Sequence, residues 1–160
     1  MFDEAFLGWL SRFQFTGDID AVEEGTVVFP GEPILRVRAP LMQAQLLETA
    51  LLNLINHQTL IATKAARVCQ AAGDDDVSEF GLRRAQGPDA GIYGARAAIL
   101  GGCGSTSNVL AGKLYGVPVR GTHAHSWVMS FGSELEAFRA YASAFPQACL
   151  LLVDTYNVLK

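Results

Sequence analysis

Two of the three histidines in this 160-residue chain lie two positions apart, in the segment Gly121-Thr-His-Ala-His-Ser-Trp127. Imidazole changes charge near neutral pH and can act as a nucleophile, a general acid or base, or a metal ligand. A zinc pair would need further Cys, His or acidic ligands, and the sequence offers none at the usual spacing, so no metal-ligating residue is predicted. Nucleophilic or acid–base chemistry stays open, and so does a loop whose histidines bond to backbone carbonyls.

A second segment places Phe80 shortly before Arg83 and Arg84. Guanidinium forks suit carboxylates and phosphates, and the face of a phenylalanine ring suits a flat heterocycle. The same residues would also fit a solvated arginine pair next to a core phenylalanine. Residue type alone leaves both interpretations open.

Two further features could bind anions or assist a histidine. The segment Gly101-Gly-Cys-Gly-Ser-Thr-Ser-Asn108 is a glycine-rich turn leading into a helix, where backbone N–H groups can cradle an anion, although an ordinary N-capped helix start fits equally well. Asp154 ends an apolar run, and its carboxylate could orient a histidine, bind magnesium through water, or cap a helix.

The elements that would position these residues follow from hydrophobic spacing and turn signals. The spacing predicts a short amphipathic helix over 2–13, β-type runs over 26–29 and 34–37, and a long helix from Pro40 to about Ala72 with Gly73 as its C-cap.

Beyond Asp76 the pattern alternates between strands and helices. It predicts strands over 77–80, 118–122 and 148–154 and helices over 89–100, 107–115 and 133–144. Such alternation is typical of βα units in a parallel sheet, and the uninterrupted apolar character of 148–154 suits burial on both faces. The reactive residues follow strand ends, the edge at which α/β proteins build active sites.

Composition limits the class of protein. Half of the residues are hydrophobic and 18% are charged, which is typical of a globular chain, and no apolar run is long enough to cross a bilayer. The N-terminus lacks the pattern of a secretory signal, and a net charge of -4 argues against a general nucleic-acid binder. Cys69, Cys103 and Cys149 are predicted to be buried free thiols, which indicates the cytoplasm.

Taken together, several stretches resemble nicotinate phosphoribosyltransferase, a type II phosphoribosyltransferase. They are Phe15-Thr-Gly-Asp18, Glu24-Gly-Thr-Val-Val-Phe-Pro30, the helical run from Leu46 to Thr59, Phe80-Gly-Leu-Arg-Arg84, Thr122–Trp127 and Val153-Asp-Thr-Tyr156. The resemblance covers nearly the whole chain, as an internal or truncated segment. It implies an α/β fold in which residues 1–40 are part of a small N-terminal α/β domain and 41–73 a long connecting helix. Residues 74–160 would be the catalytic segment, the first βα units of an incomplete, irregular α/β barrel.

The resemblance also implies a reaction. Nicotinate and phosphoribosyl pyrophosphate would give nicotinate mononucleotide and pyrophosphate, a step of NAD biosynthesis coupled to ATP through a phosphohistidine, with Mg²⁺ as cofactor. It further implies a homodimer at full length, while composition indicates a cytoplasmic protein with neither nucleic acid nor membrane as a partner.

Roles for individual residues follow from the same resemblance. His125 would take the phosphoryl group, and Asp154 would orient it or act through magnesium. Thr122 would contact nicotinate with Ser126 close by. The remaining residues implied in substrate binding are Phe80, which would stack on the pyridine ring, Arg83 and Arg84, which would face anionic groups, and Ser107 and Asn108, which would line the pocket.

The chain also departs from the family. Members are considerably longer, and their N-terminal aromatic residue and later glycine-rich phosphate loop have no counterpart here; Asn157 stands where Asp is more usual. We therefore expect little or no activity from the chain alone. Two alternatives remain: an inactive partial barrel or interaction module that needs a second polypeptide, and a related enzyme acting on nicotinamide or quinolinate.

Overall fold

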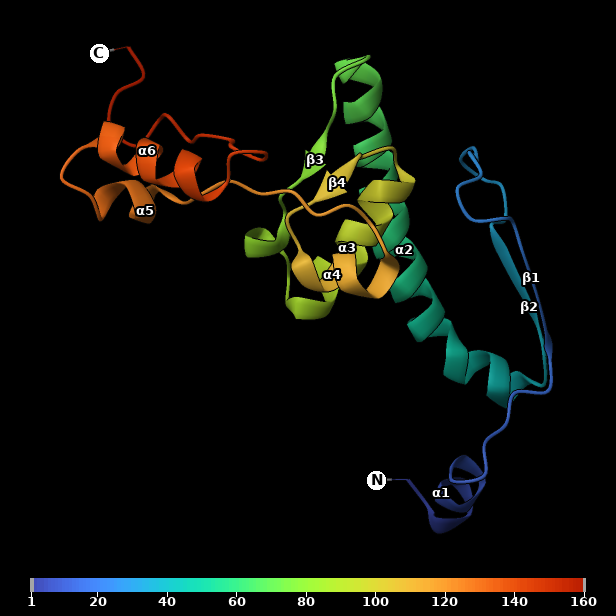
Figure 1. Ribbon diagram of the computed structural model, residues 1–160. Coiled ribbons are helices and arrows are strands. Elements are labelled where there is room, and N and C mark those ends of the chain that lie inside the picture. The colour runs from blue at the N-terminus through green and yellow to red at the C-terminus, as the bar shows by residue number, and fades with distance from the viewer. Residues whose placement is uncertain (1, 160) are drawn as a thin grey trace.

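The computed structural model describes residues 2–159, which form a mixed arrangement of helices and small sheets. Figure 1 shows a long central helix with a β-hairpin and a short helix towards its N-terminal end. A cluster of helices and a short parallel sheet packs along its other half, and two further helices lie apart on the C-terminal side. The predicted α/β class is therefore confirmed.

The first helix is shorter than the predicted 2–13. Helix α1 spans Glu4–Leu10, and the side chain of Asp3 caps it by accepting a hydrogen bond from the backbone N–H of Phe6 at 2.7 Å. Its aromatic rings contact one another in succession, with Phe6 and Trp9 stacked at a centroid distance of 5.7 Å.

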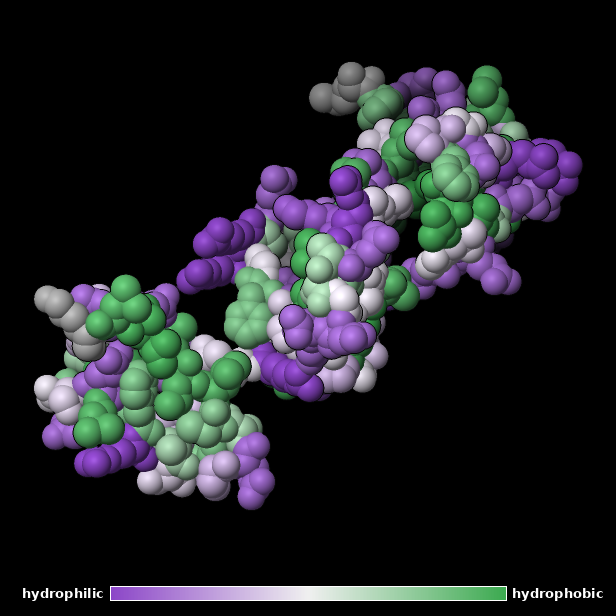
Figure 2. Space-filling model, turned by 90° about the horizontal axis from the view of Figure 1, so that it is seen from above, coloured by the Kyte–Doolittle hydropathy of each residue, from purple (hydrophilic) through white to green (hydrophobic). Residues whose placement is uncertain are grey.

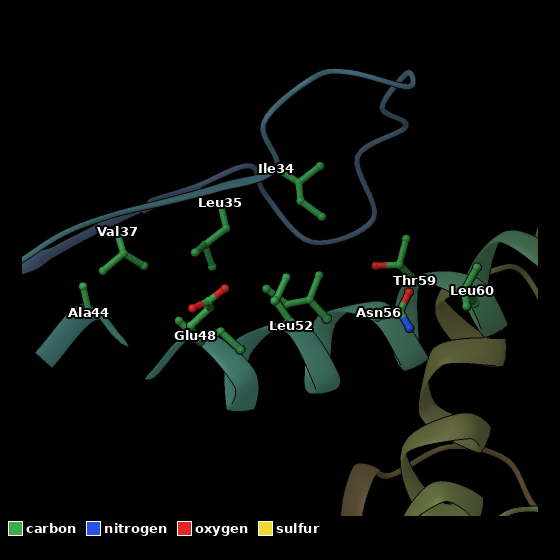
Figure 3. Close-up of a pocket in the computed structure, with 11 residues that line it drawn as sticks. Ile34, Leu35, Val37, Ala44, Glu48, Leu52, Asn56, Thr59 and Leu60 are labelled. Atoms are coloured by element: carbon green, nitrogen blue, oxygen red, sulfur yellow. The ribbon is translucent and has the colours of Figure 1, made fainter. Parts of the chain in front are cut away.

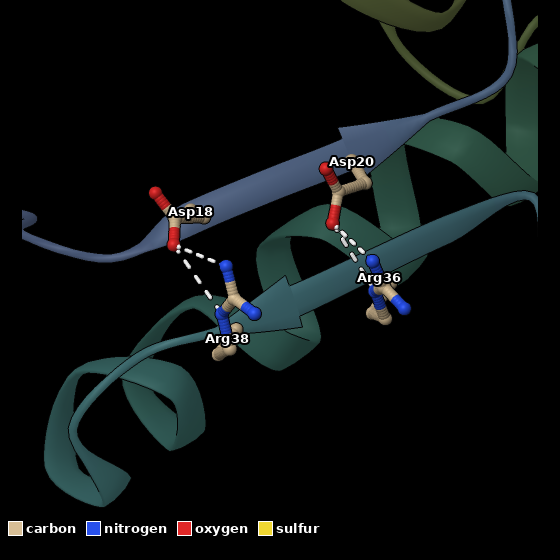
Figure 4. Close-up of polar contacts among 4 residues, drawn as sticks. All are labelled: Asp18, Asp20, Arg36 and Arg38. Atoms are coloured by element: carbon tan, nitrogen blue, oxygen red, sulfur yellow. Dashed lines mark hydrogen bonds and ion pairs between the residues drawn. The ribbon is translucent and has the colours of Figure 1, made fainter.

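A two-stranded antiparallel hairpin follows, made of β1 (Asp18–Ala21) and β2 (Leu35–Arg38). Its register sets two Asp–Arg pairs directly opposite each other, with N···O distances of 2.8 and 2.9 Å (Figure 4). These pairs are solvent-exposed, so each contributes less than about 1 kcal/mol to stability. They fix the pairing of the strands more than they stabilise the fold.

The prediction of a β-run over 26–29 is wrong, whereas the run over 34–37 corresponds to β2 with a shift of one residue. Residues 26–29 lie in the loop between the strands, where the backbone N–H of Phe29 donates to the Glu32 carboxylate at 2.8 Å. The hairpin pairs β2 with 18–21 instead, so the β-branched run has no strand beside it.

Helix α2 spans Leu41–Ala72 and ends at Gly73, whose φ of 64° favours glycine, so the predicted long helix is confirmed. It packs on α3 (Pro88–Leu100) through small residues. Ala65, Ala98 and Cys103 form the core of this contact. A Cβ added at Gly101 would lie 2.5 Å from the carbonyl oxygen of Ala62, so the close approach requires glycine there.

A short parallel sheet lies beside these helices. Strand β3 (Ser78–Glu79) pairs with β4 (Ser105–Thr106), and a single bridge joins Thr106 to Val119. The predicted strand over 77–80 is thus present in shortened form, and that over 118–122 is reduced to the bridge. Strand β4 was expected to be a loop because its two residues follow a glycine-rich run. The 3₁₀ helix η1 (Leu82–Arg84) and α4 (Val109–Tyr115) complete this part of the fold.

Helices α5 (His125–Met129) and α6 (Glu134–Ala144) pack on each other around Val128 and Ala137. Helix α6 was predicted, whereas α5 was not. The predicted buried strand over 148–154 is wrong: these residues have no regular secondary structure and are mostly exposed. Within residues 2–159 no strand lies beside them to accept their backbone hydrogen bonds.

The cysteines correct a second expectation. All three are free, as predicted, but only Cys103 is buried, while Cys69 is half-buried and Cys149 is exposed. Cys149 loses its predicted burial because the strand expected around it does not form.

None of the helices in the described part of the chain has the length and apolar character required to cross a membrane.

Candidate functional site

His125 is the first residue of α5, and polar groups face both of its ring nitrogens. Its Nδ1 lies 3.2 Å from the hydroxyl of Thr155, within hydrogen-bonding distance, and its Nε2 lies 4.0 Å from a carboxylate oxygen of Asp154. The side chains of His125 and Asp154 are 51% and 60% exposed. The hydroxyl can fix the orientation of the ring while Nε2 stays open to a reactant from solvent.

Thr122 and Ser126 flank this histidine. The Thr122 hydroxyl donates to the carbonyl oxygen of His123 at 2.9 Å, and Ser126 is an exposed residue in the first turn of α5. Both side chains therefore belong to the same surface segment as His125.

His123 has a different environment from His125. Its side chain is 8% exposed, and its Nε2 accepts a hydrogen bond from the backbone N–H of Leu152 at 3.1 Å. The ring packs edge-on against Tyr141 at a centroid distance of 4.8 Å. The two histidines thus differ: His123 is buried and hydrogen-bonded to the backbone, whereas the His125 ring is exposed to solvent.

A second group of predicted site residues follows β3. The side chain of Phe80 is 48% exposed, and Arg83 and Arg84 are exposed on η1. The Glu79 carboxylate supports this turn, because it accepts hydrogen bonds from the backbone N–H of Gly81 and, at 2.6 Å, from the hydroxyl of Thr106. The Phe80 ring and the two arginine side chains are therefore accessible in the turn that follows β3.

Ser107 and Asn108 lie next to this group; Ser107 is half-buried and Asn108 is buried. Asn108 is 2% exposed, and its Oδ1 accepts a hydrogen bond from the backbone N–H of Ala111 at 3.1 Å, which caps α4. The backbone N–H of Ser107 donates to the carbonyl of Glu79 at 2.9 Å and continues the β3–β4 pairing. Asn108 therefore holds the start of α4, and its role in substrate binding stays a prediction.

The structure brings the predicted residues together as two groups rather than one. Thr122, His125, Ser126 and Asp154 lie with α5, whereas Phe80, Arg83, Arg84, Ser107 and Asn108 lie with the parallel sheet. Figure 1 shows the α5–α6 pair well apart from β3, β4 and α4. Sequence reasoning places Thr155 among the polar residues at the end of the apolar run but assigns it no role, and its contact with His125 is seen only in the structure.

The described residues contain no cluster of three or more His, Cys, Asp or Glu side chains that could hold a metal ion. The carboxylate of Asp154 is the acidic group next to His125. A single carboxylate suits magnesium, which keeps several waters and is otherwise bound by substrate phosphates.

An apolar groove lies away from both groups. It has a volume of about 420 Å³ and runs between β2 and the first half of α2 (Figure 3). Figure 3 shows Leu35 and Val37 pointing from the strand towards Ala44, Glu48 and Leu52 of the helix. Because the lining of this groove holds one charged residue and none of the predicted site residues, the groove is a packing surface rather than a catalytic pocket. Hydrophobic side chains are also exposed elsewhere, at the α5–α6 end of the molecule (Figure 2).

Comparisons with known proteins agree with the residue pattern. Residues 1–56 match the family model described as the nicotinate phosphoribosyltransferase (NAPRTase) N-terminal domain. Nicotinate phosphoribosyltransferase pncB2 of Mycobacterium tuberculosis is 50% identical over 159 residues, which are 99% of this chain and 34% of that protein. The nicotinate phosphoribosyltransferase of Bacillus subtilis is 54% identical over 140 residues, 88% of this chain and 28% of that protein.

Solved structures give the same result. The human nicotinic acid phosphoribosyltransferase superposes with a TM-score of 0.87 at 40% identity, over 98% of this chain and 41% of that chain. The nicotinate-nucleotide pyrophosphorylase of Pyrococcus furiosus superposes with a TM-score of 0.80 at 30% identity, over 89% of this chain and 37% of that chain.

The shared fold and the residue pattern match an α/β segment of phosphoribosyltransferases. More narrowly, the chain is similar over nearly its whole length to part of nicotinate phosphoribosyltransferases, and its residues 1–56 match the N-terminal domain model of that family. It spans about a third of the length of the curated relatives it matches.

Proposed function

We propose that this chain carries the phosphohistidine segment of a nicotinate phosphoribosyltransferase. The complete reaction would form nicotinate mononucleotide and pyrophosphate from nicotinate and phosphoribosyl pyrophosphate, coupled to ATP, in NAD biosynthesis. The observation that supports this proposal best is the environment of His125, whose two ring nitrogens face Thr155 and Asp154 in an open position.

In the proposed step the neutral imidazole of His125 donates its Nδ1–H to the Thr155 hydroxyl, which leaves the lone pair on Nε2 free. Nε2 attacks the γ-phosphorus of ATP and forms a P–N bond. The bond between phosphorus and the bridging oxygen breaks, and its electron pair leaves with ADP. Asp154 is the carboxylate that would hold a hydrated magnesium ion beside Nε2, and this ion would neutralise phosphate charge.

The substrate contacts form the second part of the proposal. Thr122 and Ser126 would contact nicotinate next to His125. The exposed ring of Phe80 would stack on the pyridine, and Arg83 and Arg84 would face the nicotinate carboxylate or a phosphate. The separation of the two groups supports the expectation that the isolated chain forms little or no mononucleotide.

Incubation of the 160-residue chain with radiolabelled ATP, magnesium, nicotinate and phosphoribosyl pyrophosphate tests this function. We expect an acid-labile, alkali-stable phosphoryl group on the peptide that contains His125, and its loss in His125→Asn. His57→Gln serves as the histidine control, because His57 lies on α2 and contacts the carbonyl of Ala90 instead. Equal labelling of wild type and His125→Asn would contradict the proposal.

The identity of the base is tested in the same assay. Any mononucleotide that the chain forms should come from nicotinate rather than from nicotinamide, because the cations Arg83 and Arg84 suit a carboxylate on a flat ring. More product from nicotinamide or quinolinate than from nicotinate would favour the related enzyme.

The second candidate function is an interaction module that needs a second polypeptide. The exposed apolar groove between β2 and α2 favours it, since apolar surfaces of this kind mark protein contacts. This candidate predicts no phosphohistidine and a chain that self-associates in sedimentation. Leu52→Asp, inside the groove, should then reduce the association, whereas Val27→Asp, on an exposed loop outside it, should not.

A further inference from the structure

The buried histidine next to the proposed nucleophile connects three parts of the chain. His123 belongs to the segment that leads into α5, its ring packs on Tyr141 and Phe138 of α6, and its Nε2 accepts the backbone N–H of Leu152. Because α6 holds the ring on one side, the position of the acceptor nitrogen is fixed. A fixed acceptor can hold in place a chain segment that has no regular secondary structure.

The segment that it holds has few other attachments. Residues 150–156 form no regular secondary structure. Among the described residues, the hydrogen bonds that tie 151–156 to the rest of the chain are the one from Leu152 to His123 and the one between Thr155 and His125. Leu152 is two positions before Asp154 and three before Thr155. The bond to His123 therefore fixes the backbone close to the residues that carry these two side chains.

We propose that His123 is a positioning residue that holds Asp154 and Thr155 against His125. The catalytic consequence rests on the proposed function, while the structural role does not. The geometry requires neutral His123 with its proton on Nδ1, because Nε2 accepts from Leu152. The carbonyl oxygen of Ala124, 3.5 Å from Nδ1, can accept a hydrogen bond from this N–H.

Two variants separate the acceptor from the ring. His123→Phe keeps an aromatic ring for Tyr141 and Phe138 but removes the acceptor. His123→Gln places an amide oxygen near the position of Nε2 and restores an acceptor. Tyr141→Leu is the packing control, since it weakens the support of the ring but leaves the acceptor on His123.

Nuclear magnetic resonance of the ¹⁵N-labelled 160-residue chain provides the readouts. Loss of one hydrogen bond corresponds to about a tenfold change in an equilibrium, so the Leu152 amide should exchange about tenfold faster in His123→Phe. The nuclear Overhauser contact between the His125 ring and the Thr155 methyl group should weaken in the same variant. In His123→Gln both should return to wild-type values, and in Tyr141→Leu the Leu152 amide should change no more than the amides of α6.

Unchanged exchange of Leu152 in a folded His123→Phe would overturn the proposal. If that variant does not fold, the wild-type ring decides: a proton found on Nε2 of His123 overturns the proposal, and a proton on Nδ1 supports it. Phosphoryl transfer to His125 should also fall in His123→Phe and recover in His123→Gln. Absence of phosphohistidine in the wild type would contradict the proposed function alone, because the exchange and tautomer measurements do not depend on it.

Discussion

The two groups of candidate site residues are held in different ways. The central body, made of β3, η1, α3, β4, α4 and the second half of α2, fixes its residues by close packing of small buried side chains such as Ala95, Ala97 and Ala111. The C-terminal lobe, made of His123, α5, α6 and residues 145–159, buries little beyond Val128, Ala137 and His123 itself.

The position of a site residue is therefore fixed by different interactions in the two regions. In the central body, a substrate-binding side chain depends on a packed scaffold that tolerates little change. In the lobe, the relation of His125 to Asp154 and Thr155 depends on a few polar contacts made by an irregular segment. Perturbations should therefore act through packing in one region and through single hydrogen bonds in the other.

Thiol labelling should show the largest contrast between the regions. Burial, followed by the contact with Cys69, raises the pKa of Cys103 from about 9 to about 11. This shift lowers its reactive thiolate fraction about 100-fold near pH 8, in addition to its lack of access. Alkylation followed by mass spectrometry should modify the exposed Cys149 of the lobe first and Cys103 last. Equal alkylation rates for Cys149 and Cys103 would show that the central body does not protect Cys103 from solvent.

A glycine substitution tests the packing of the central body directly. In Gly101→Ala the new Cβ would press on the Ala62 carbonyl and the Ala65 side chain of α2, and such overpacking costs about 1–3 kcal/mol. Urea denaturation should show this loss. Gly121→Ala is the matched control, because nothing lies within 4 Å of its added Cβ, and it should change stability by less than about 0.5 kcal/mol. Equal losses of stability in the two variants would show that the packing at Gly101 is no tighter than that at Gly121.

The smallest expected effect concerns the edge of the central body, where Arg96 donates to both carboxylate oxygens of Glu24 at 2.6 Å. The hydrogen bond from Arg96 lowers the pKa of Glu24 below its usual 4.5. A depressed carboxyl pKa stabilises the fold above the unfolded value, and this stability is lost as the pH falls through the folded value.

Glu24→Gln should therefore reduce the unfolding free energy by less than about 1 kcal/mol at neutral pH, since the pair is partly exposed. Denaturation at a series of pH values should show the difference from wild type shrinking towards zero below pH ~4. A difference that stays constant in acid would mean that the ion pair is not its source.

The predictability of the fold follows the same division. Helices α2, α3 and α6 were predictable because apolar spacing and terminal residues such as Gly73 and Ser133 encode them locally. The apolar run 148–154 could not be assigned correctly, because forming a strand depends on a neighbouring strand that local sequence does not specify. Strand β4 has only two residues, which is too short a run to show a period.

The candidate site was predictable to a similar extent. Residue type and spacing left both histidines of the motif open, and the resemblance selected His125 together with the other site residues. Spacing could not reveal that His123 bonds to Leu152 or that Asn108 caps α4, because both depend on contacts made in the folded chain. Thr155 could not be given a role from the sequence because its contact with His125 joins segments 30 residues apart.

Site mapping of phosphate on the chain after incubation with ATP and magnesium decides whether His125 is the nucleophile. We expect an acid-labile phosphoryl group on Nε2 of His125, with Thr155→Val lowering its yield because the partner of Nδ1 is lost. A phosphoryl group on another residue, or full labelling in His125→Asn, would contradict it.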